Sequence, residues 1–532
     1  MTSTADPLLP SRPESRASRY DGWRGRVSAD PALRRRLAWL APLAVTLLGA
    51  ILRFWNLGHP HSLVFDETYY VKDAWSQWSL GYAAAWPEDA DARFAGGETD
   101  IFTTDPSFAV HPPLGKYLIG AGMALFGADS SFGWRVAVAV AGTLSVLLVY
   151  AIAREISRSI PFATVAGFLM AIDGLAIVMS RVAILDMMLT ALVLLAFWFV
   201  LRDRRTHLDR LSAAMAARRR PDEWVAWGPV LWNRPWLLAA GAAAGAACAV
   251  KWSGAWMLAA LGLYAVVTDA LARRRLGVYY WPLDGVRQGA VAFLLMIPVS
   301  LAVYLASWAG WLATDGGYGR HAADASPASG ILSGVPTGLQ NLWTYHGTIY
   351  AATAEITTAH TYSSPAWQWP LLLRPTSMYA GNTPDGVDGC ASARGCLEIL
   401  YSMPNPLIWW GGIIAAVWLL VRFVLVRDGR LAIVLVGIGA AYAPWLLYPE
   451  RTIFQFYTVL MLPFLILALT LALQQIAGAA HAEQLRRNAG QRTVLVILAV
   501  VTLVSTFWYP LWSATRVPYE FYWMHVWLPG WV

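Results

Sequence analysis

Long apolar runs alternate with polar segments along most of the chain. Runs of about 20 apolar residues are long enough to cross a bilayer as α-helices. The pattern predicts about eleven spans, at residues 36–57, 133–153, 160–179, 182–201, 236–250, 254–272, 288–308, 406–426, 431–447, 453–475 and 493–511. The expected fold class is therefore an all-α, polytopic membrane protein.

Composition agrees with this fold class and argues against a nucleic-acid partner. The 532 residues are 57% hydrophobic and only 14% charged, whereas a soluble protein carries nearer a quarter charged residues. The net charge of +7 would suggest nucleic acid in a soluble protein. Here most arginines lie in short segments between spans, where they set orientation, so no nucleic-acid partner is expected.

Basic residues gather in alternate segments between the spans. They occur at 34–36, 154–158, 202–220, 273–275, 422–430 and 486–492. Positively charged segments stay on the cytoplasmic side, which predicts a multi-pass protein of the cytoplasmic (inner) membrane with its N-terminus inside. The expected organisation is a disordered cytoplasmic tail at 1–33, one transmembrane domain at 34–511 and an external aromatic tail at 512–532.

Two long external loops are expected, at 58–132 and 309–404. The first is acidic and rich in Trp, and parts of it, such as 111–126, are predicted to be helices on the membrane surface. The second is long enough to indicate a function. Cys390 and Cys396 in the second loop suit a local disulfide in an oxidising compartment; a zinc site is less favoured because no His lies nearby.

An acidic pair, Asp66 and Glu67, follows the first span among aromatic and apolar residues. Ionisable groups close to a bilayer are costly and often mark function. The predicted topology brings further ionisable residues from distant segments to the same membrane face: Lys72, His111, Lys116, Arg181, Asp186, Lys251, His346, Glu355, His360, Arg374, Glu450 and Arg451.

Acids, cations and aromatic residues at a bilayer edge suit a sugar donor carried on a lipid phosphate. Cations would hold the phosphate and stabilise the charge that builds on it as it leaves. A carboxylate would take the proton of an incoming hydroxyl and stabilise an oxocarbenium-like transition state. One acid of the pair is the expected base, and the other would orient substrate or pair with a cation.

Structural interpretations of the same residues stay open. The acidic pair could be solvated or could cap a helix. Arg181 could extend its charge to the interface or pair with Asp186 one turn away. His111 precedes a Pro-Pro turn, and His346, Glu355 and His360 are most simply loop residues. No metal-ligand spacing occurs, so no metal or other cofactor is expected.

Several motifs, in this order, resemble the protein O-mannosyltransferase family of GT-C glycosyltransferases in its bacterial form. They are Phe65-Asp66-Glu67, His111 to Lys116, Arg181 to Asp186, Lys251-Trp252-Ser253-Gly254, Tyr362 to Pro370 and Pro449 to Phe454. The resemblance covers nearly the whole chain from the first span to the last. It implies a GT-C bundle. The loop at 309–404 is too short for the MIR domain that eukaryotic members carry there.

The resemblance also implies transfer of mannose from polyprenyl-phosphate mannose to Ser or Thr of secreted proteins, with inversion. Asp66 would be the base, with Glu67 beside it. Membrane lipid and a secretion translocon are further expected partners. Expected donor-site residues are Arg181, Lys251, Arg451, Lys116, Lys72, His111, Asp186 and Trp252; acceptor candidates in the second loop are His346, Glu355, His360, Ser364 and Trp367.

Two other functions fit parts of the pattern. A related GT-C enzyme could use the same type of donor to glycosylate a lipid or a cell-wall glycan, and only the acceptor separates it from the first interpretation. A lipid or sugar transporter is less favoured. Such a protein should show ionisable residues at the membrane midplane and two related halves with broken helices, and the sequence shows neither.

Overall fold

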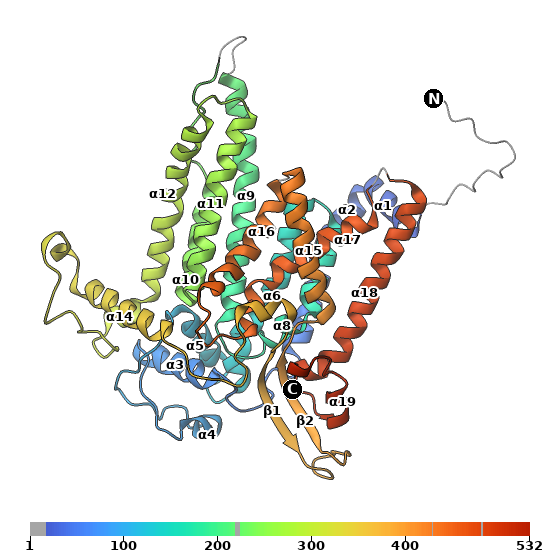
Figure 1. Cartoon of the computed structure of the whole chain (residues 1–532). Helices are drawn as coiled ribbons and strands as arrows, with labels where there is room; N and C mark the ends of the chain where they lie inside the picture. The colour runs from blue at the N-terminus through green and yellow to red at the C-terminus, as the bar shows by residue number, and fades with distance from the viewer. Residues whose placement is uncertain (1–17, 219–223, 428, 480–481, 532) are drawn as a thin grey trace.

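A bundle of long helices forms the body of the molecule (Figure 1). The computed structural model describes residues 18–218, 224–427, 429–479 and 482–531. Every predicted span overlaps one of its helices. These are α2 (Pro31–Phe54), α6 (Ser131–Ser157), α7 (Ile160–Ile172), α9 (Asp186–Arg218), α10 (Pro235–Val250), α11 (Ser253–Arg275), α12 (Trp281–Ser307), α15 (Pro406–Val426), α16 (Gly429–Tyr442), α17 (Leu462–Ala477) and α18 (Gln484–Trp512).

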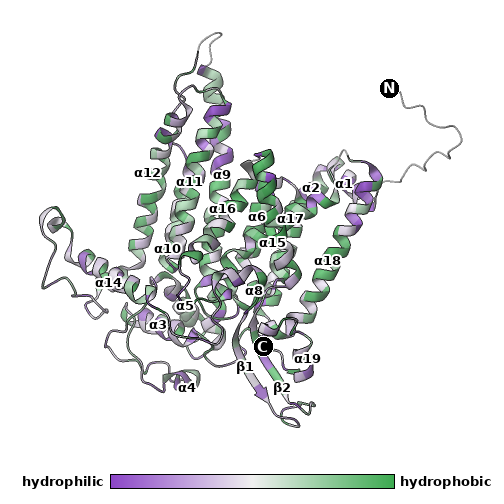
Figure 2. Cartoon of the chain, in the orientation of Figure 1, coloured by the Kyte–Doolittle hydropathy of each residue, from purple (hydrophilic) through white to green (hydrophobic). Residues whose placement is uncertain are grey.

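Helix length and composition agree with a membrane-spanning protein. Among the described residues, six helices are long and apolar enough to cross a membrane, namely α2, α6, α11, α12, α15 and α18. Figure 2 shows hydrophobic residues along most of the bundle and a hydrophilic upper end of α9. This helix continues to Arg218, so arginines expected in a loop at 202–218 lie on its polar half instead.

The two ends of the bundle differ in character. One end, uppermost in Figure 1, holds the arginine-rich last turns of α9 and α11 and the short connections at 158–159 and 276–280. We call it the arginine-rich end. The opposite end, the loop end, holds the long segments at 55–130 and 308–405 and the C-terminal segment. The two long loops predicted from the sequence therefore meet at one end.

The N-terminal prediction is wrong in part. Residues 19–29, expected to be disordered, form helix α1 (Arg19–Ala29). The Ser18 side chain caps this helix by accepting from the Asp21 backbone N–H at 3.0 Å, a favoured N-cap interaction. The rest of the predicted tail, 1–17, lies outside the described residues.

The loop end also contains short helices. They are α3 (Glu67–Leu80), α4 (Ala90–Ala95) and α5 (Leu114–Phe126), followed later by α8 (Gly174–Val178), α13 (Ala309–Ala313), α14 (Thr337–Ala354) and α19 (Tyr519–Trp523). The helix expected at 111–126 is thus α5. Short 3-10 helices lie at Gly330–Gly334, Ala366–Leu371, Ala443–Leu447, Gln455–Leu460 and Pro529–Trp531.

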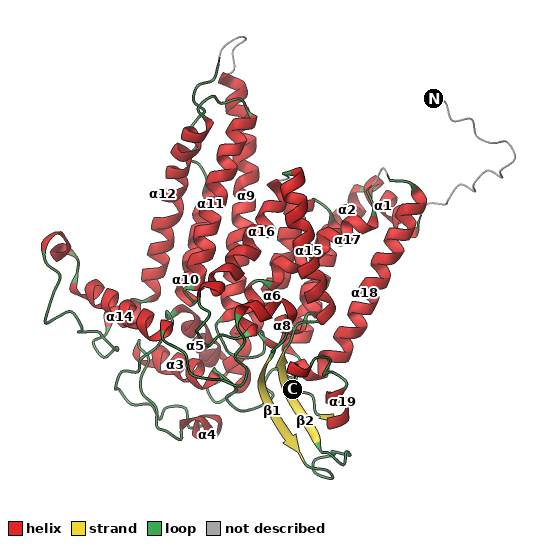
Figure 3. Ribbon diagram, in the orientation of Figure 1, coloured by secondary structure: helices red, strands yellow, loops and turns green. Residues whose placement is uncertain are grey.

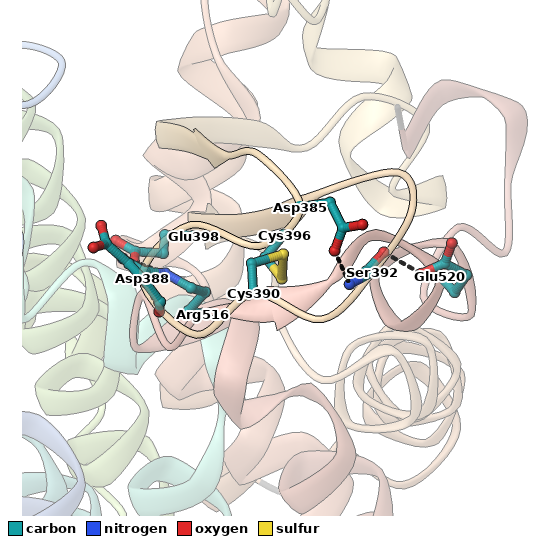
Figure 4. The surroundings of a disulfide bond; sticks show 8 residues. All are labelled: Asp385, Asp388, Cys390, Ser392, Cys396, Glu398, Arg516 and Glu520. Carbon is teal, nitrogen blue, oxygen red and sulfur yellow. Dashed lines mark hydrogen bonds and ion pairs between the residues drawn. A yellow bond between two sulfur atoms is a disulfide. The ribbon is translucent and has the colours of Figure 1, made fainter.

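A small antiparallel sheet joins the second long loop to the C-terminal segment (Figure 3). Its strand order is β1 (Thr376–Thr383), β2 (Cys396–Ser402), β3 (Val517–Pro518). The predicted disulfide between Cys390 and Cys396 closes the loop between β1 and β2. Around it, Arg516 pairs with Glu398 at 2.7 Å and Ser392 donates to Glu520 at 2.9 Å (Figure 4). These contacts fix the C-terminal segment against the hairpin.

Candidate active site

The two acids of the pair, adjacent in sequence, have opposite surroundings. Glu67 is fully buried. Its carboxylate accepts from Nε and Nη2 of Arg135, both at 2.8 Å, and from the backbone N–H groups of Val64 at 3.0 Å and Ala183 at 2.7 Å. A carboxylate has about four acceptor positions, and here four donors occupy them. These contacts argue against a proton-transfer role for Glu67 and give it a structural one.

Arg135, the partner of Glu67, is not among the predicted site residues. It is buried in α6 and also donates to the backbone carbonyls of Leu57, Pro60 and Ser62. The pair therefore ties the segment before α3 to the bundle. A sequence signal did exist, since Arg135 is a single cation inside the predicted span 133–153, and such residues usually have a buried partner.

Asp66 occupies the N-cap position of α3, yet its side chain makes no capping hydrogen bond. Within the described residues, no hydrogen bond or ion pair to its carboxylate is present, although the side chain is half-buried. Desolvation raises the pKa of Asp66 to about 6; nearby Lys251 opposes this shift and nearby Asp186 adds to it. A carboxylate without partners and with a pKa near neutrality suits a general base.

The backbone at Phe65 presents Asp66 in this position. Phe65 has φ +51°, a left-handed conformation that costs a bulky residue about 1–2 kcal/mol. Its ring packs edge-on against Phe454 and Phe456, with centroids 5.8 and 5.6 Å away, and against predicted acceptor residue His360 at 6.0 Å. Aromatic contacts from the segment before α17 thus stabilise the turn that carries Asp66.

A cavity of about 420 Å³ lies at the loop end. Asp66 is not in its wall, but Lys251, whose charge acts on the Asp66 carboxylate, is. The wall includes four of the predicted donor-site residues, His111, Lys251, Trp252 and Arg451, together with Tyr457. Lys251 Nζ lies 2.9 Å from Asp186 Oδ1 and 4.4 Å from the centre of the Tyr457 ring. Of the open interpretations of Arg181, the one that pairs it with Asp186 is wrong, because Asp186 pairs with Lys251.

Arg451 is the cation of this cavity that has no acid to neutralise it. In the described part of the chain it forms no ion pair, its buried Nε has no hydrogen-bond partner, and its guanidinium lies 5.7 Å from the Trp445 ring. It does not start a span as expected, because α17 begins only at Leu462. His111 adds no charge, since desolvation and the nearby cations Lys251, Lys116 and Arg451 hold its pKa well below the usual value.

Contacts with α12 and α14 fix the orientation of Trp252. Its indole N–H donates to the Tyr304 hydroxyl at 3.0 Å. The ring of His346 stacks on it with centroids 5.5 Å apart, and His346 itself contacts the Tyr304 hydroxyl. Predicted acceptor residue His346 thus supports the cavity wall through Trp252.

Three predicted donor-site cations are engaged elsewhere. Arg181 is buried and donates to backbone carbonyls of Arg53, Trp55, Asn56 and Ser513, which argues against phosphate binding and shows that it joins the end of α2 to the C-terminal segment. Lys116 is buried against Asp73 at 3.0 Å, and Lys72 pairs with Asp91 at 2.6 Å. Neither lines the cavity.

The other predicted acceptor residues are scattered over the second loop. Ser364 is fully buried and its backbone N–H donates to Ile453. Trp367 and Glu355 are exposed. None of the three lines the cavity, so their suggested contact with an acceptor stays a prediction.

An apolar groove adjoins the cavity. It has a volume of about 1230 Å³ and lies between α9 and α11 on one side and α15 and α16 on the other. Trp256, Ala440 and Pro444 line both the groove and the cavity. The groove reaches Arg204, Arg275 and Arg427 near the arginine-rich end. A long hydrocarbon chain attached to a group in the cavity could follow this path through the membrane.

We predict that Arg135→Met lowers the free energy of unfolding by about 3–5 kcal/mol, because it leaves the Glu67 carboxylate buried and unpaired. Lys72→Met is the control, since it breaks the more exposed pair with Asp91 and should cost no more than about 1 kcal/mol. Thermal unfolding of the purified proteins measures both. Equal effects of the two substitutions would contradict the structural role of Glu67.

Comparison with known proteins identifies the family. Residues 103–307 match the family model for dolichyl-phosphate-mannose-protein mannosyltransferase, and residues 338–531 match the model for the C-terminal four-helix region of protein O-mannosyltransferase. A polyprenol-phosphate-mannose–protein mannosyltransferase of Mycolicibacterium smegmatis (strain MKD8) is 34% identical over 94% of both chains. One from Mycobacterium tuberculosis (strain H37Rv) is 32% identical over 94% of this chain and 93% of its own.

A solved structure shows the same fold. The Saccharomyces cerevisiae Pmt1–Pmt2 complex bound to the sugar donor contains a chain that superposes with a TM-score of 0.69, at 15% identity, over 92% of each chain. At this identity the likeness concerns the fold alone. Together with the sequence matches it shows that the chain belongs to the protein O-mannosyltransferase family and has the GT-C membrane fold.

Proposed function

We propose that this glycosyltransferase moves mannose from polyprenyl-phosphate mannose to Ser or Thr hydroxyls of secreted proteins, with Asp66 as general base. The observation that carries the proposal is the Asp66 carboxylate, which has no partner among the described residues and is acted on by the charge of Lys251, a residue that lines a cavity together with Arg451. The donor and the class of acceptor are inferred from relatives that match this chain over most of their length and are named polyprenol-phosphate-mannose–protein mannosyltransferases.

The reaction follows from these positions. The acceptor oxygen attacks the anomeric carbon while Asp66 takes the hydroxyl proton. The bond from that carbon to the phosphate oxygen breaks, and its electron pair leaves with the polyprenyl phosphate. Arg451, whose buried Nε has no hydrogen-bond partner among the described residues, and Lys251 stabilise the charge that develops there. Attack opposite the leaving group inverts the anomeric centre.

The apolar groove is the proposed place for the polyprenyl chain. Because Trp256, Ala440 and Pro444 line both spaces, a phosphate in the cavity can continue into a hydrocarbon tail between α11 and α16. In a membrane the alternative surroundings of the chain are lipid tails, so van der Waals packing against the groove would favour its binding there. Trp252, oriented by Tyr304, is placed to contact the sugar.

We also propose that the loop end faces outward from the cytoplasmic membrane. The concentration of arginine at the other end supports this orientation, as does the disulfide at the loop end, since disulfides persist in oxidising compartments. Secreted chains would reach Asp66 from that side, where a translocon delivers them.

Transfer without a metal stays a prediction. The described residues contain no group of three or more His, Cys, Asp or Glu arranged to hold a metal ion. The positive charge at the cavity comes instead from Lys251 and Arg451.

We expect Asp66→Asn to lower the transfer rate by about 10²–10⁴-fold, because a positioned base contributes about that much. Transfer of labelled mannose from polyprenyl-phosphate mannose to a Ser/Thr-rich peptide, in membranes with equal protein levels, measures it. Asp91→Asn, at an exposed acid of the same end, is the control. If wild type leaves the peptide unlabelled and the label enters a lipid or glycan fraction, the result supports a different acceptor.

The pH profile tests the state of the base. Since the pKa of Asp66 is about 6 and only the carboxylate accepts a proton, the rate should rise as pH increases through about 6 and level off above it. The initial rate of mannose transfer between pH 4.5 and 8 would show this limb. A rate that is flat down to pH 4.5 contradicts the assignment, provided that the protein stays folded at that pH.

Arg451→Gln should lower kcat/KM about 10- to 100-fold, which corresponds to loss of a hydrogen bond to a charged group. Arg394→Gln is the matched control, because Arg394 is an exposed arginine of the loop end that does not line the cavity. Steady-state rates at varied donor concentration separate KM from kcat. Equal, small losses in both variants would remove Arg451 from the donor site.

A further inference from the structure

A second cavity, of about 560 Å³, lies at the arginine-rich end of the bundle. Helices α1, α2, α17 and α18 and the turn between α6 and α7 surround it. Its volume lies within the range of ordinary ligand pockets. It shares no lining residue with the cavity of Lys251 and Arg451, and the proposed transfer reaction does not use it.

The charged part of its wall is entirely basic. Arg24, Arg34, Arg154 and Arg158 line this cavity, and no acidic residue does. Within the described residues, these four side chains form no hydrogen bond or ion pair. The nearest acids in sequence are already engaged. Asp21 pairs with Arg487, Asp30 accepts from the backbone N–H groups of Ala32 and Leu33, and Glu155 pairs with Arg202 at 2.8 Å and Arg205 at 3.4 Å. Four cations without partners thus surround one space.

The deeper part of the wall is apolar. It contains Phe162 and Val165 of α7, Leu473 of α17 and Leu498 of α18. From Gln491 to Leu498, both in the wall, α18 descends about 10 Å at the usual rise of an α-helix. The cavity therefore combines arginines near the end of the bundle with apolar residues farther along the helices. A phospholipid has the same order of parts, with its headgroup at the membrane surface and its chains below.

Helix α1 forms one wall of the cavity. Asp21 accepts from Gln484 at 3.0 Å and from Gln491 at 3.1 Å, and it pairs with Arg487 of α18. These contacts hold Tyr20 and Trp23 of α1 in the wall of the cavity. Aromatic residues of this kind are typical of the headgroup level of a bilayer.

We propose that this cavity binds one anionic diacyl phospholipid, with its phosphate at the four arginines and its chains among the apolar residues below. Arginine is well suited to phosphate because its planar donors match the phosphate oxygens. Basic pockets between transmembrane helices are known to hold anionic headgroups. The bound lipid would join α1 to the bundle, at the end opposite to Asp66.

Native mass spectrometry of the full-length protein in detergent, with added phosphatidylglycerol or phosphatidylcholine, tests the proposal. We expect a retained phosphatidylglycerol adduct and no retained phosphatidylcholine adduct. Arg24→Gln combined with Arg158→Gln should weaken the adduct about 10- to 30-fold, because each arginine contributes about a factor of five. Arg35→Gln with Arg36→Gln, the same charge change at exposed residues outside the cavity, should leave it nearly unchanged.

A second variant keeps the test independent of charge. Val165→Phe adds volume to the apolar wall and should also reduce the adduct, while thermal unfolding without added lipid confirms that each variant is folded. Three results would overturn the proposal: equal weakening by both arginine pairs, equal retention of the two phospholipids, or displacement of phosphatidylglycerol by an equimolar amount of polyprenyl phosphate. None of these readouts depends on mannose transfer.

Discussion

Burial of the Glu67 carboxylate is the constraint on which the loop end depends. A buried carboxylate is tolerated only when it is paired and its oxygens are fully hydrogen-bonded, and here Arg135 and two backbone N–H groups meet that condition. The same four contacts join α6, the segment before α3 and the turn before α9. A fully hydrogen-bonded side chain thereby fixes the place of Asp66, the proposed base.

Asp66 has the opposite surroundings, although it is the next residue. Its carboxylate is half-buried and lacks the donors that satisfy Glu67, and this desolvation raises its pKa into the range of a base. The strained backbone at Phe65 and the aromatic contacts around it hold the group in this state. Functional sites commonly concentrate such locally unfavourable features, which the surrounding structure stabilises.

The charges around the cavity divide in a similar way. Lys251 is held by Asp186 and Tyr457, so that part of its charge is compensated. Arg451 lines the same cavity, and within the described residues it forms no ion pair and its buried Nε has no hydrogen-bond partner. The uncompensated cation is the one best placed to bind a phosphate that gains charge. At the far end of the bundle, uncompensated arginines again mark a space with an apolar depth.

The sequence by itself determined the helical membrane fold, the position of nearly every long helix, the two long loops that meet at one end and the family. Runs of apolar residues and basic segments are local signals, and they persist in any arrangement of the helices. It did not determine which of two adjacent acids is free. Arg135 and Glu67 are 68 positions apart, and the Lys251–Asp186 pair is 65 apart. It also placed Arg181 with the donor, because an arginine that binds backbone carbonyls and one that binds phosphate look alike in a sequence. Only the tertiary structure decided these roles, since hydrogen-bond partners and desolvation arise when distant segments pack together.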